Sequence, residues 1–398
     1  MGVYINKRQV RFSGSKNSRY VDKTGLIKYV NSTLDSEDFY LTCVTRPRRF
    51  GKTTAVNMLY AYYDKWRDSR ELFSGLEIES DPSYEMHLNK YPVISFSVAT
   101  FLSLAQQGDS QRNLKDIVPA IKSKLMEDIT AEYPDLALPD KDELMDRLYD
   151  IVCMTGEKFI LLIDEWDCII REINDPEIVQ SYLNFLQSLF KSDYTYMIFT
   201  GVYMTGILPI VKINHDSIFN EFQEFTIINP GPLGSYFGFS GEEVKNLCER
   251  FHMDYEKMCR WYDGYIVGTM KSIFNPNSVA SAINHKDFAS YWSNTRSYES
   301  IAMYISMDFD GLKDNVLRLL AGEKVSVKTE KFNNILSDIN SKDDVLTVLI
   351  HLGYLSYDPE TREAFVPNHE VFMQLENAVE ASNYGRIIEA LADSDKNS

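Results

Sequence analysis

Residues 46–54 read RPRRFGKTT, and this stretch decides the fold because of what stands on either side of it. The apolar run before it, residues 39–44 (FYLTCV), is typical of a buried strand. Residues 55–66 (AVNMLYAYYDKW), which follow it, carry apolar side chains at helical spacing. In a strand–loop–helix with Gly-Lys-Thr at its turn, backbone N–H groups and the helix N-terminus can face a phosphate. The stretch therefore predicts a phosphate-binding P-loop.

The predicted loop supplies most of the contacts that we expect with a nucleotide. Lys52 would reach the β- and γ-phosphates, and the Thr53 hydroxyl would hold Mg²⁺. Arg46 stands where the full pattern G-x-x-x-x-G-K-[ST] has its first glycine, so the tripeptide GKT alone is weak evidence. The other residues expected to bind the nucleotide are Arg48, Arg49, Phe50, Gly51 and Thr54.

A second motif, FILLIDEWD at residues 159–167, supports the assignment of residues 46–54 as a P-loop. Its apolar run predicts a strand buried on both faces, as in a parallel sheet. Asp164 would order Mg²⁺ at the carboxyl end of this strand, and Glu165 would polarise the attacking water. The plainer interpretation is a strand that happens to end in surface carboxylates. An upstream GKT disfavours it, because both motifs would lie at the same end of a parallel sheet.

The order of the strands indicates a branch of the P-loop proteins. Residues 91–99 predict a strand before Asp164, and residues 196–200 and 225–228 predict two after it. An additional strand, with a glutamate beside the aspartate, marks the additional-strand ATPases rather than the kinase and GTPase branch. Thr200 ends the predicted strand 196–200, where such enzymes keep a sensor of the γ-phosphate. A plain strand cap is the alternative.

Two other segments allow more than one interpretation. Asp22 precedes a short helical pattern, so it can simply cap that helix. A segment just upstream of a P-loop strand can also fold over the adenine, which makes Asp22 a candidate nucleotide contact. Residues 207–224 are either a switch loop or a surface loop.

Composition narrows the class of protein. The formal charge of −17 argues against a nucleic-acid surface over the whole chain. The five cysteines form no C-x-x-C motif, which indicates reduced thiols. The six histidines are dispersed and show no metal-ligand spacing. With no apolar run of transmembrane length and no signal peptide, we expect a cytoplasmic protein with no membrane partner.

The later part of the chain differs in character from the first. A helical pattern at 343–352, followed by a hairpin pattern at 353–368, is the outline of a winged helix. Such a module can bind DNA or dock a protein, and the acidic residues around it favour the protein. The expected domains are an ATPase core (1–235, with 1–38 packed on it), a helical region with an aromatic turn (236–305), and a winged-helix-like domain with a tail (306–398).

These residues resemble a known family, the bacterial AAA-ATPase-like proteins. The resemblance spans nearly the whole chain, and its motifs stand in the family's order: YVDKT at 20–24, RPRRFGKT at 46–53, IDEWD at 163–167, TGV at 200–202, WYDGY at 261–265 and PNHEV at 367–371. The family's loop itself reads RPRRFGK[ST], so Arg46 is typical of it. Trp166 departs from the more usual IDEYD.

The resemblance implies an α/β P-loop ATPase with ATP and Mg²⁺ as ligands, linked to nucleic-acid processing or defence. Many members carry a C-terminal nuclease-like domain of the PD-(D/E)XK type. No D…E-x-K core follows PNHEV here, so we expect no nuclease activity from these residues.

Two functions from different classes remain open. The first is an ATPase that acts as a switch or motor subunit, with Glu165, Lys52 and Thr200 as its catalytic residues. An arginine acting in trans would require self-association. The second is a slow or non-hydrolysing scaffold, in which ATP binding changes how the C-terminal region docks a protein partner.

Overall fold

The computed structural model describes residues 2–38, 40–107, 114–139, 143–191, 194–210, 212–213, 216–217, 219–292, 302, 304–307, 309, 311–332 and 339–381. The chain divides into two compact units. Unit 1 is Met1–Thr45 with Lys52–Thr226, and unit 2 is Arg46–Gly51 with Ile227–Ser398. The chain therefore leaves unit 1 for the length of the predicted phosphate loop and then returns to it.

Unit 1 is built on a parallel sheet of five strands in the order β2-β3-β4-β1-β7. The strands are β1 (Leu41–Thr45), β2 (Val93–Ser97), β3 (Phe159–Asp164), β4 (Phe199–Gly206) and β7 (Gln223–Phe225). β4 comes after β3 in the sequence but lies between β1 and β3, in parallel with both. The predicted α/β P-loop class with an additional strand is thereby confirmed.

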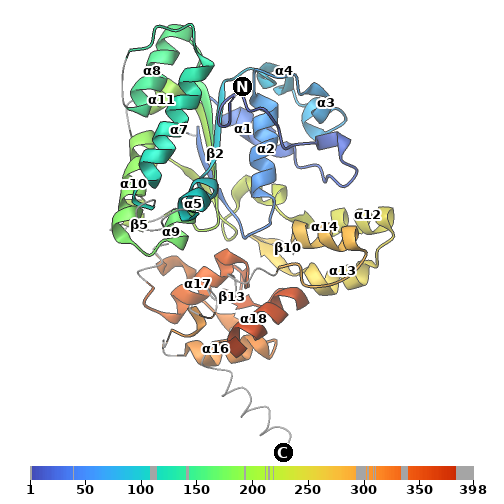
Figure 1. Cartoon of the computed structure of the whole chain (residues 1–398). Helices are drawn as coiled ribbons and strands as arrows, with labels where there is room; N and C mark the ends of the chain where they lie inside the picture. Colours follow the sequence, from blue (N-terminus) through green and yellow to red (C-terminus); the bar gives the residue numbers. More distant parts are fainter. Residues whose placement is uncertain are drawn as a thin grey trace, which may run out of the picture. The chain divides into compact units, whose positions relative to one another are not determined.

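Helices cover both faces of this sheet, which explains why β1 and β3 are buried along their whole length. In Figure 1, α2 (Lys52–Tyr63) lies on one side of the sheet, while α7 (Ile117–Glu132) and α8 (Leu144–Thr155) lie on the other. The remaining elements of unit 1 are η1 (Gly14–Lys16), α1 (Gly25–Thr33), α3 (Arg70–Phe73), η2 (Glu77–Ser80), α4 (Tyr84–His87), α5 (Val98–Gln106), α9 (Cys168–Glu172), α10 (Pro176–Phe190), α11 (Tyr194–Ile198), β5 (Lys212–Ile213) and β6 (Asp216–Ser217).

The prediction of a strand over residues 196–200 is wrong. The helix α11 covers most of that segment, and β4 begins only at Phe199. A short apolar run fits a buried helix as well as a strand, so periodicity could not separate the two. Thr200 consequently stands near the beginning of its strand rather than at its end. Of the segment 207–224, residues 211, 214, 215 and 218 lie outside the described residues.

The carboxylate of Asp128 in α7 holds the N-terminal residues against the rest of unit 1. Asp128 Oδ2 accepts hydrogen bonds from the backbone N–H groups of Val3, Tyr4 and Ile5, at 2.9, 2.7 and 3.1 Å. Ile5 also forms an antiparallel bridge with Ile94 of β2. The first residues therefore lie along the edge strand of the sheet.

Unit 2 contains two small antiparallel sheets, in the orders β8-β10-β9 and β11-β13-β12. Ser240 and Glu243 form a capping box at the start of α12 (Gly241–Phe251), with bonds of 2.7 and 3.3 Å. The elements of unit 2 are η3 (Gly231–Tyr236), β8 (Phe239–Ser240), α12 (Gly241–Phe251), α13 (Tyr255–Tyr262), β9 (Tyr265–Val267), β10 (Met270–Phe274), α14 (Pro276–His285), α16 (Leu312–Leu320), β11 (Val325–Ser326), η4 (Thr329–Lys331), α17 (Lys342–Leu352), β12 (Ser356–Asp358), β13 (Glu363–Phe365) and α18 (His369–Ala381).

The helix and hairpin expected at 343–368 are present as α17, β12 and β13. Every residue of α17 from Asp344 to Leu352 is buried. A helix buried all round cannot lay its side chains in a DNA groove, so this observation disfavours DNA reading by α17. The assignment of 306–398 to a winged-helix domain stays a prediction.

Burial of a histidine in α17 gives the chain a sensitivity to acid. His351 is 4% exposed, and burial lowers its pKa to about 3. The folded state therefore resists a proton that the unfolded chain accepts near pH 6.5, so stability falls as pH falls below that value. We expect about 1.4 kcal/mol of destabilisation at pH 5.5 from this group.

Urea unfolding at pH 7.5 and pH 5.5 measures this effect. His351→Leu should reduce the loss of stability at the lower pH, whereas His285→Leu, on the exposed side of α14, should leave it as in the unmodified chain. Equal acid losses in all three proteins would rule out His351 as the cause.

Candidate nucleotide site

One carboxylate joins three elements at the carboxyl end of the sheet in unit 1. Asp164, the last residue of β3, is 5% exposed. Its Oδ2 accepts a hydrogen bond from Thr53 Oγ1 at 2.7 Å, and its Oδ1 accepts one from Thr205 Oγ1 at 2.6 Å. Thr53 stands in the first turn of α2, and Thr205 stands near the end of β4. The two predicted motifs, GKT and IDE, therefore meet in space.

Lys52, the first residue of α2, is 6% exposed and lies near the carboxylates of Asp167, Asp164 and Glu165. Burial lowers the pKa of Lys52 to about 8, against the opposing effect of Asp167, Asp164 and Glu165. A buried ammonium next to acidic groups can hold the charge of a phosphate, since it needs no further desolvation to do so.

Glu165 has an unusual backbone. Its φ is +55°, in the left-handed region that a residue other than glycine enters only at some cost. Burial raises the pKa of its carboxyl above the ordinary value, and Asp164 beside it acts in the same direction. The raised pKa favours proton acceptance, as a general base for water requires.

Asp167 and Arg171 belong to the same region, and the sequence interpretation missed both. Asp167 Oδ2 accepts hydrogen bonds from the N–H groups of Ile207 and Leu208, at 3.1 and 2.9 Å, and from Arg171 Nε at 3.3 Å. Burial disfavours the charge of Arg171, but Asp167 and then Glu172 hold its pKa above the usual value. Asp167 thus fixes the turn after β4 to α9. The spacing of four residues between Asp167 and Arg171 is the sequence signal that could have found the pair.

Thr200 lies at the other end of the sheet from Asp164. In the pairing of β3 with β4, Ile160 stands opposite Gly201, whereas Ile163 stands opposite Met204. At about 3.3 Å per residue, Thr200 is more than 10 Å from the level of Asp164. The expectation that Thr200 senses the γ-phosphate is therefore wrong, and the threonine of β4 that contacts Asp164 is Thr205.

Asp22 serves local structure. Its Oδ1 accepts from the N–H and hydroxyl of Thr24, at 2.9 and 2.7 Å, and its Oδ2 accepts from the N–H of Glu77 at 2.7 Å. These bonds fasten the start of α1 to η2. A contact of Asp22 with adenine stays a prediction.

The predicted loop residues 46–51 are described with unit 2, to which they belong. Arg46 is not among the described residues with positive φ, so its position needs no glycine. Arg49 and Gly51 do have positive φ, at +67° and +92°. An added Cβ on Gly51 would meet nothing within 4 Å, so only the backbone conformation requires glycine there. Phosphate contacts by residues 48–51 stay a prediction, as do those by the exposed Thr54.

The donor set fits Mg²⁺. This ion is bound in phosphate sites by one or two protein oxygens, with phosphate and water oxygens filling the other positions. The Thr53 hydroxyl and the Asp164 carboxylate supply such oxygens, 2.7 Å apart. Among the described residues there is no group of three or more His, Cys, Asp or Glu side chains that could hold a metal ion by themselves.

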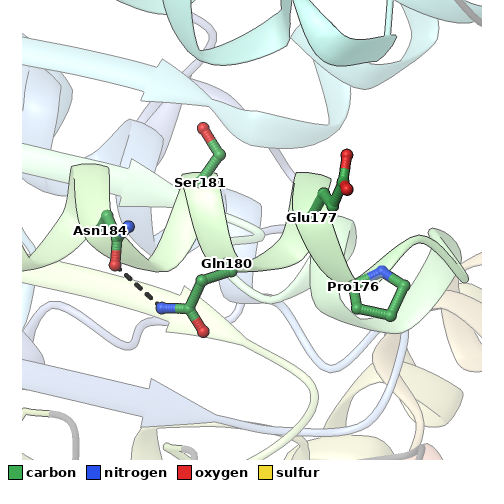
Figure 2. A pocket seen from close by; sticks show the side chains of 5 residues that line it. All are labelled: Pro176, Glu177, Gln180, Ser181 and Asn184. Carbon is green, nitrogen blue, oxygen red and sulfur yellow. Dashed lines mark hydrogen bonds between the residues drawn. The ribbon is translucent and has the colours of Figure 1, made fainter.

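A separate open hollow lies over α10 and contains none of these residues. Its lining comes from that single helix, where Gln180 Nε2 donates to Asn184 Oδ1 at 2.9 Å (Figure 2). Of the helices that the structure describes, none is long and apolar enough to cross a membrane.

Similar solved structures are distant. They include the ORC2 protein of Aeropyrum pernix in ADPNP–ADP complexes, with 12% identity, coverage of 95% of this chain and 99% of that chain, and a TM-score of 0.41. Cdc6p from Pyrobaculum aerophilum has 11% identity, coverage of 95% and 99%, and a TM-score of 0.29. The A. pernix ORC1 protein in complex with DNA has 10% identity, coverage of 98% and 100%, and a TM-score of 0.29. These values are too low for any conclusion about this chain.

A family model gives a firmer result. The family described as "Predicted AAA-ATPase" matches residues 12–219, which are more than half of the chain. No curated protein matches. The matched range contains Lys52, Thr53, Asp164, Glu165 and Thr205. The chain belongs to the predicted AAA-ATPase family.

Proposed function

We propose that the chain is a cytoplasmic ATPase that binds ATP with Mg²⁺, hydrolyses it, and works as a nucleotide-driven switch. The observation that supports this best is the position of Asp164, whose two oxygens are hydrogen-bonded to Thr53 and Thr205 at 2.7 and 2.6 Å. It brings the GKT threonine, the acidic end of β3 and the end of β4 to one place.

In this proposal each side chain has a separate task. Lys52 holds the β- and γ-phosphate oxygens, and the Thr53 hydroxyl and Asp164 hold the metal. Bound Mg²⁺ would neutralise charge between the two phosphates. Glu165 accepts the proton of the attacking water, and Thr205 keeps the Asp164 carboxylate in place.

We infer that the C-terminal region docks a protein rather than DNA. The helix α17 is buried, and the hairpin after it carries Asp358, Glu360 and Glu363. The hairpin also carries Arg362, so with its three carboxylates it keeps a net charge of −2, and the ammonium of Lys271 lies 3.9 Å from both Asp358 and Glu360. An acidic surface repels a phosphate backbone. A role in nucleic-acid processing or defence rests on the family resemblance alone.

A pair of matched substitutions in β4 tests the assignment of Thr205. Thr205→Val keeps the shape but leaves one oxygen of a buried carboxylate without its donor, which costs about 1–3 kcal/mol at such a group. We expect ATP turnover to fall about 10- to 100-fold. Thr200→Val, in the same strand and equally buried, should retain turnover. Equal turnover in the two variants would contradict the assignment.

The non-hydrolysing scaffold uses the same residues and differs only in turnover. It predicts ATP binding without phosphate release in any variant.

A further inference from the structure

Residues 46–50, which directly precede Gly51 and Lys52, each contact other residues of unit 2, to which they belong. We name them the arm. The guanidinium of Arg46 lies 5.1 Å from the ring centroid of Phe237. An added Cβ on Gly353 would lie 2.7 Å from Pro47 Cβ, so Pro47 is packed directly on that glycine. The first two residues of the arm are therefore fixed by two separate segments.

The next two residues are held through polar groups. Asn275 Nδ2 donates to the carbonyl of Arg48 at 3.4 Å. Arg49 Nη1 donates to the carbonyl of Tyr291. The N–H of Tyr291 donates in turn to Glu370 Oε1 at 2.5 Å, and Glu370 is fully buried. A buried carboxylate thus positions the residue that receives Arg49.

Phe50, the last residue of the arm, is buried against Tyr265 and Gly238, which we name the socket. It is 1% exposed, and its ring meets that of Tyr265 edge-on at 5.0 Å between centroids. The carbonyl of Phe50 accepts a hydrogen bond from the N–H of Gly238 at 3.4 Å. The Tyr265 hydroxyl donates to the carbonyl of Gly353 at 2.8 Å, so Tyr265 links both ends of the arm.

The motifs WYDGY and PNHEV build this socket. Gly264 has φ of +107°, and an added Cβ there would lie 2.0 Å from the carbonyl oxygen of Pro367. Asn368 Nδ2 donates to the carbonyl of Asp263 at 2.9 Å. The two motifs therefore cross in direct contact, with Tyr265 on one and Glu370 on the other. A phosphate-binding role does not explain them, but support of the arm does.

We propose that Phe50 and the residues that hold the arm are positioning residues for nucleotide binding, and that unit 2 sets ATP affinity through them. This inference rests on the proposed function. The arm is continuous with Lys52 through one glycine, so its conformation fixes where the backbone before Lys52 can bind phosphate. Coupling of this kind is reciprocal, so a partner bound to unit 2 and ATP should change each other's affinity by the same factor.

Two glycines give a matched test. Gly353 and Gly322 are both left-handed, at φ of +90° and +80°, so alanine costs similar backbone strain at each. An added Cβ on Gly322 meets nothing within 4 Å, whereas one on Gly353 presses on Pro47. We expect Gly353→Ala to raise KM for ATP, and Kd for a non-hydrolysable analogue, on the order of 10-fold with kcat nearly unchanged. Gly322→Ala should leave both constants unchanged.

The split between KM and kcat separates positioning from simple damage. A variant that is only partly folded has fewer active molecules, so its apparent kcat falls while KM stays. Tyr265→Phe keeps the ring against Phe50 but loses the hydroxyl bond to Gly353, so it should raise KM less than Tyr265→Ala, which removes both contacts. This second pair serves if Gly353→Ala does not fold.

The outcomes are distinct. A KM that rises in Gly353→Ala and Tyr265→Ala but not in Gly322→Ala supports the inference. Equal KM in Gly353→Ala and Gly322→Ala, or a loss confined to kcat, overturns it and leaves the proposed function intact. If the unmodified chain binds no nucleotide, the proposed function fails, and this inference fails with it.

Discussion

Replacing Glu165 with glutamine should lower ATP turnover by about 10²- to 10⁴-fold, the usual contribution of a general base, while ATP binding is retained. The variant keeps the shape of the side chain and removes its ability to accept a proton. Because burial and Asp164 already raise the pKa of Glu165, a neutral side chain there should not reduce stability. The measurement is phosphate release with Mg²⁺, beside Kd for ATP and the thermal unfolding temperature.

The control for this substitution is Glu172→Gln, at the end of α9 on the same stretch of chain. It should keep full turnover. A Glu165→Gln protein that turns over ATP at the rate of the control would show that another group, or none, activates the water.

Replacing Lys52 with alanine should weaken ATP binding itself. The lysine is expected to make charge-assisted hydrogen bonds to the phosphates, which contribute about 1.5–3 kcal/mol, or roughly 10- to 100-fold in Kd. The change also removes one of the two buried cations near Asp164, Asp167 and Glu165 and leaves Arg171 as the other, so stronger repulsion of the nucleotide should add to the loss. Isothermal titration with a non-hydrolysable ATP analogue and Mg²⁺ measures the effect.

Lys65→Ala provides the comparison for Lys52→Ala. Lys65 follows the other end of α2 and pairs with Glu157 near the surface. It should bind nucleotide as the unmodified chain does. An unchanged Kd in Lys52→Ala would mean that this lysine does not meet the phosphates.

Much of unit 1 follows from local sequence pattern. The strand before RPRRFGKT, the helix after it and the strand FILLID are confirmed within a few residues, because each carries a strong apolar period or an unbroken apolar run. The meeting of Thr53 with Asp164 also follows, because parallel strands bring their carboxyl ends to one edge.

The errors and omissions have physical causes. Thr205 was missed because residues 194–198, although apolar, form a helix, which moves the start of β4 to Phe199. Local pattern gives no sign of the arm contacts, since Arg48 and Asn275 are 227 residues apart, and Arg49 and Tyr291 are 242 apart. The arginines of the loop were therefore assigned to phosphate alone.

In the proposed function, Glu165 and its neighbours hydrolyse bound ATP. The most direct measurement is a single-turnover experiment with protein in excess over labelled ATP and Mg²⁺, for the unmodified chain and Glu165→Gln. We predict that the unmodified chain converts its bound ATP to ADP at least about 100-fold faster than the variant, which should hold ATP intact. Equal persistence of bound ATP in both proteins would contradict hydrolysis and leave the nucleotide-gated scaffold as the function.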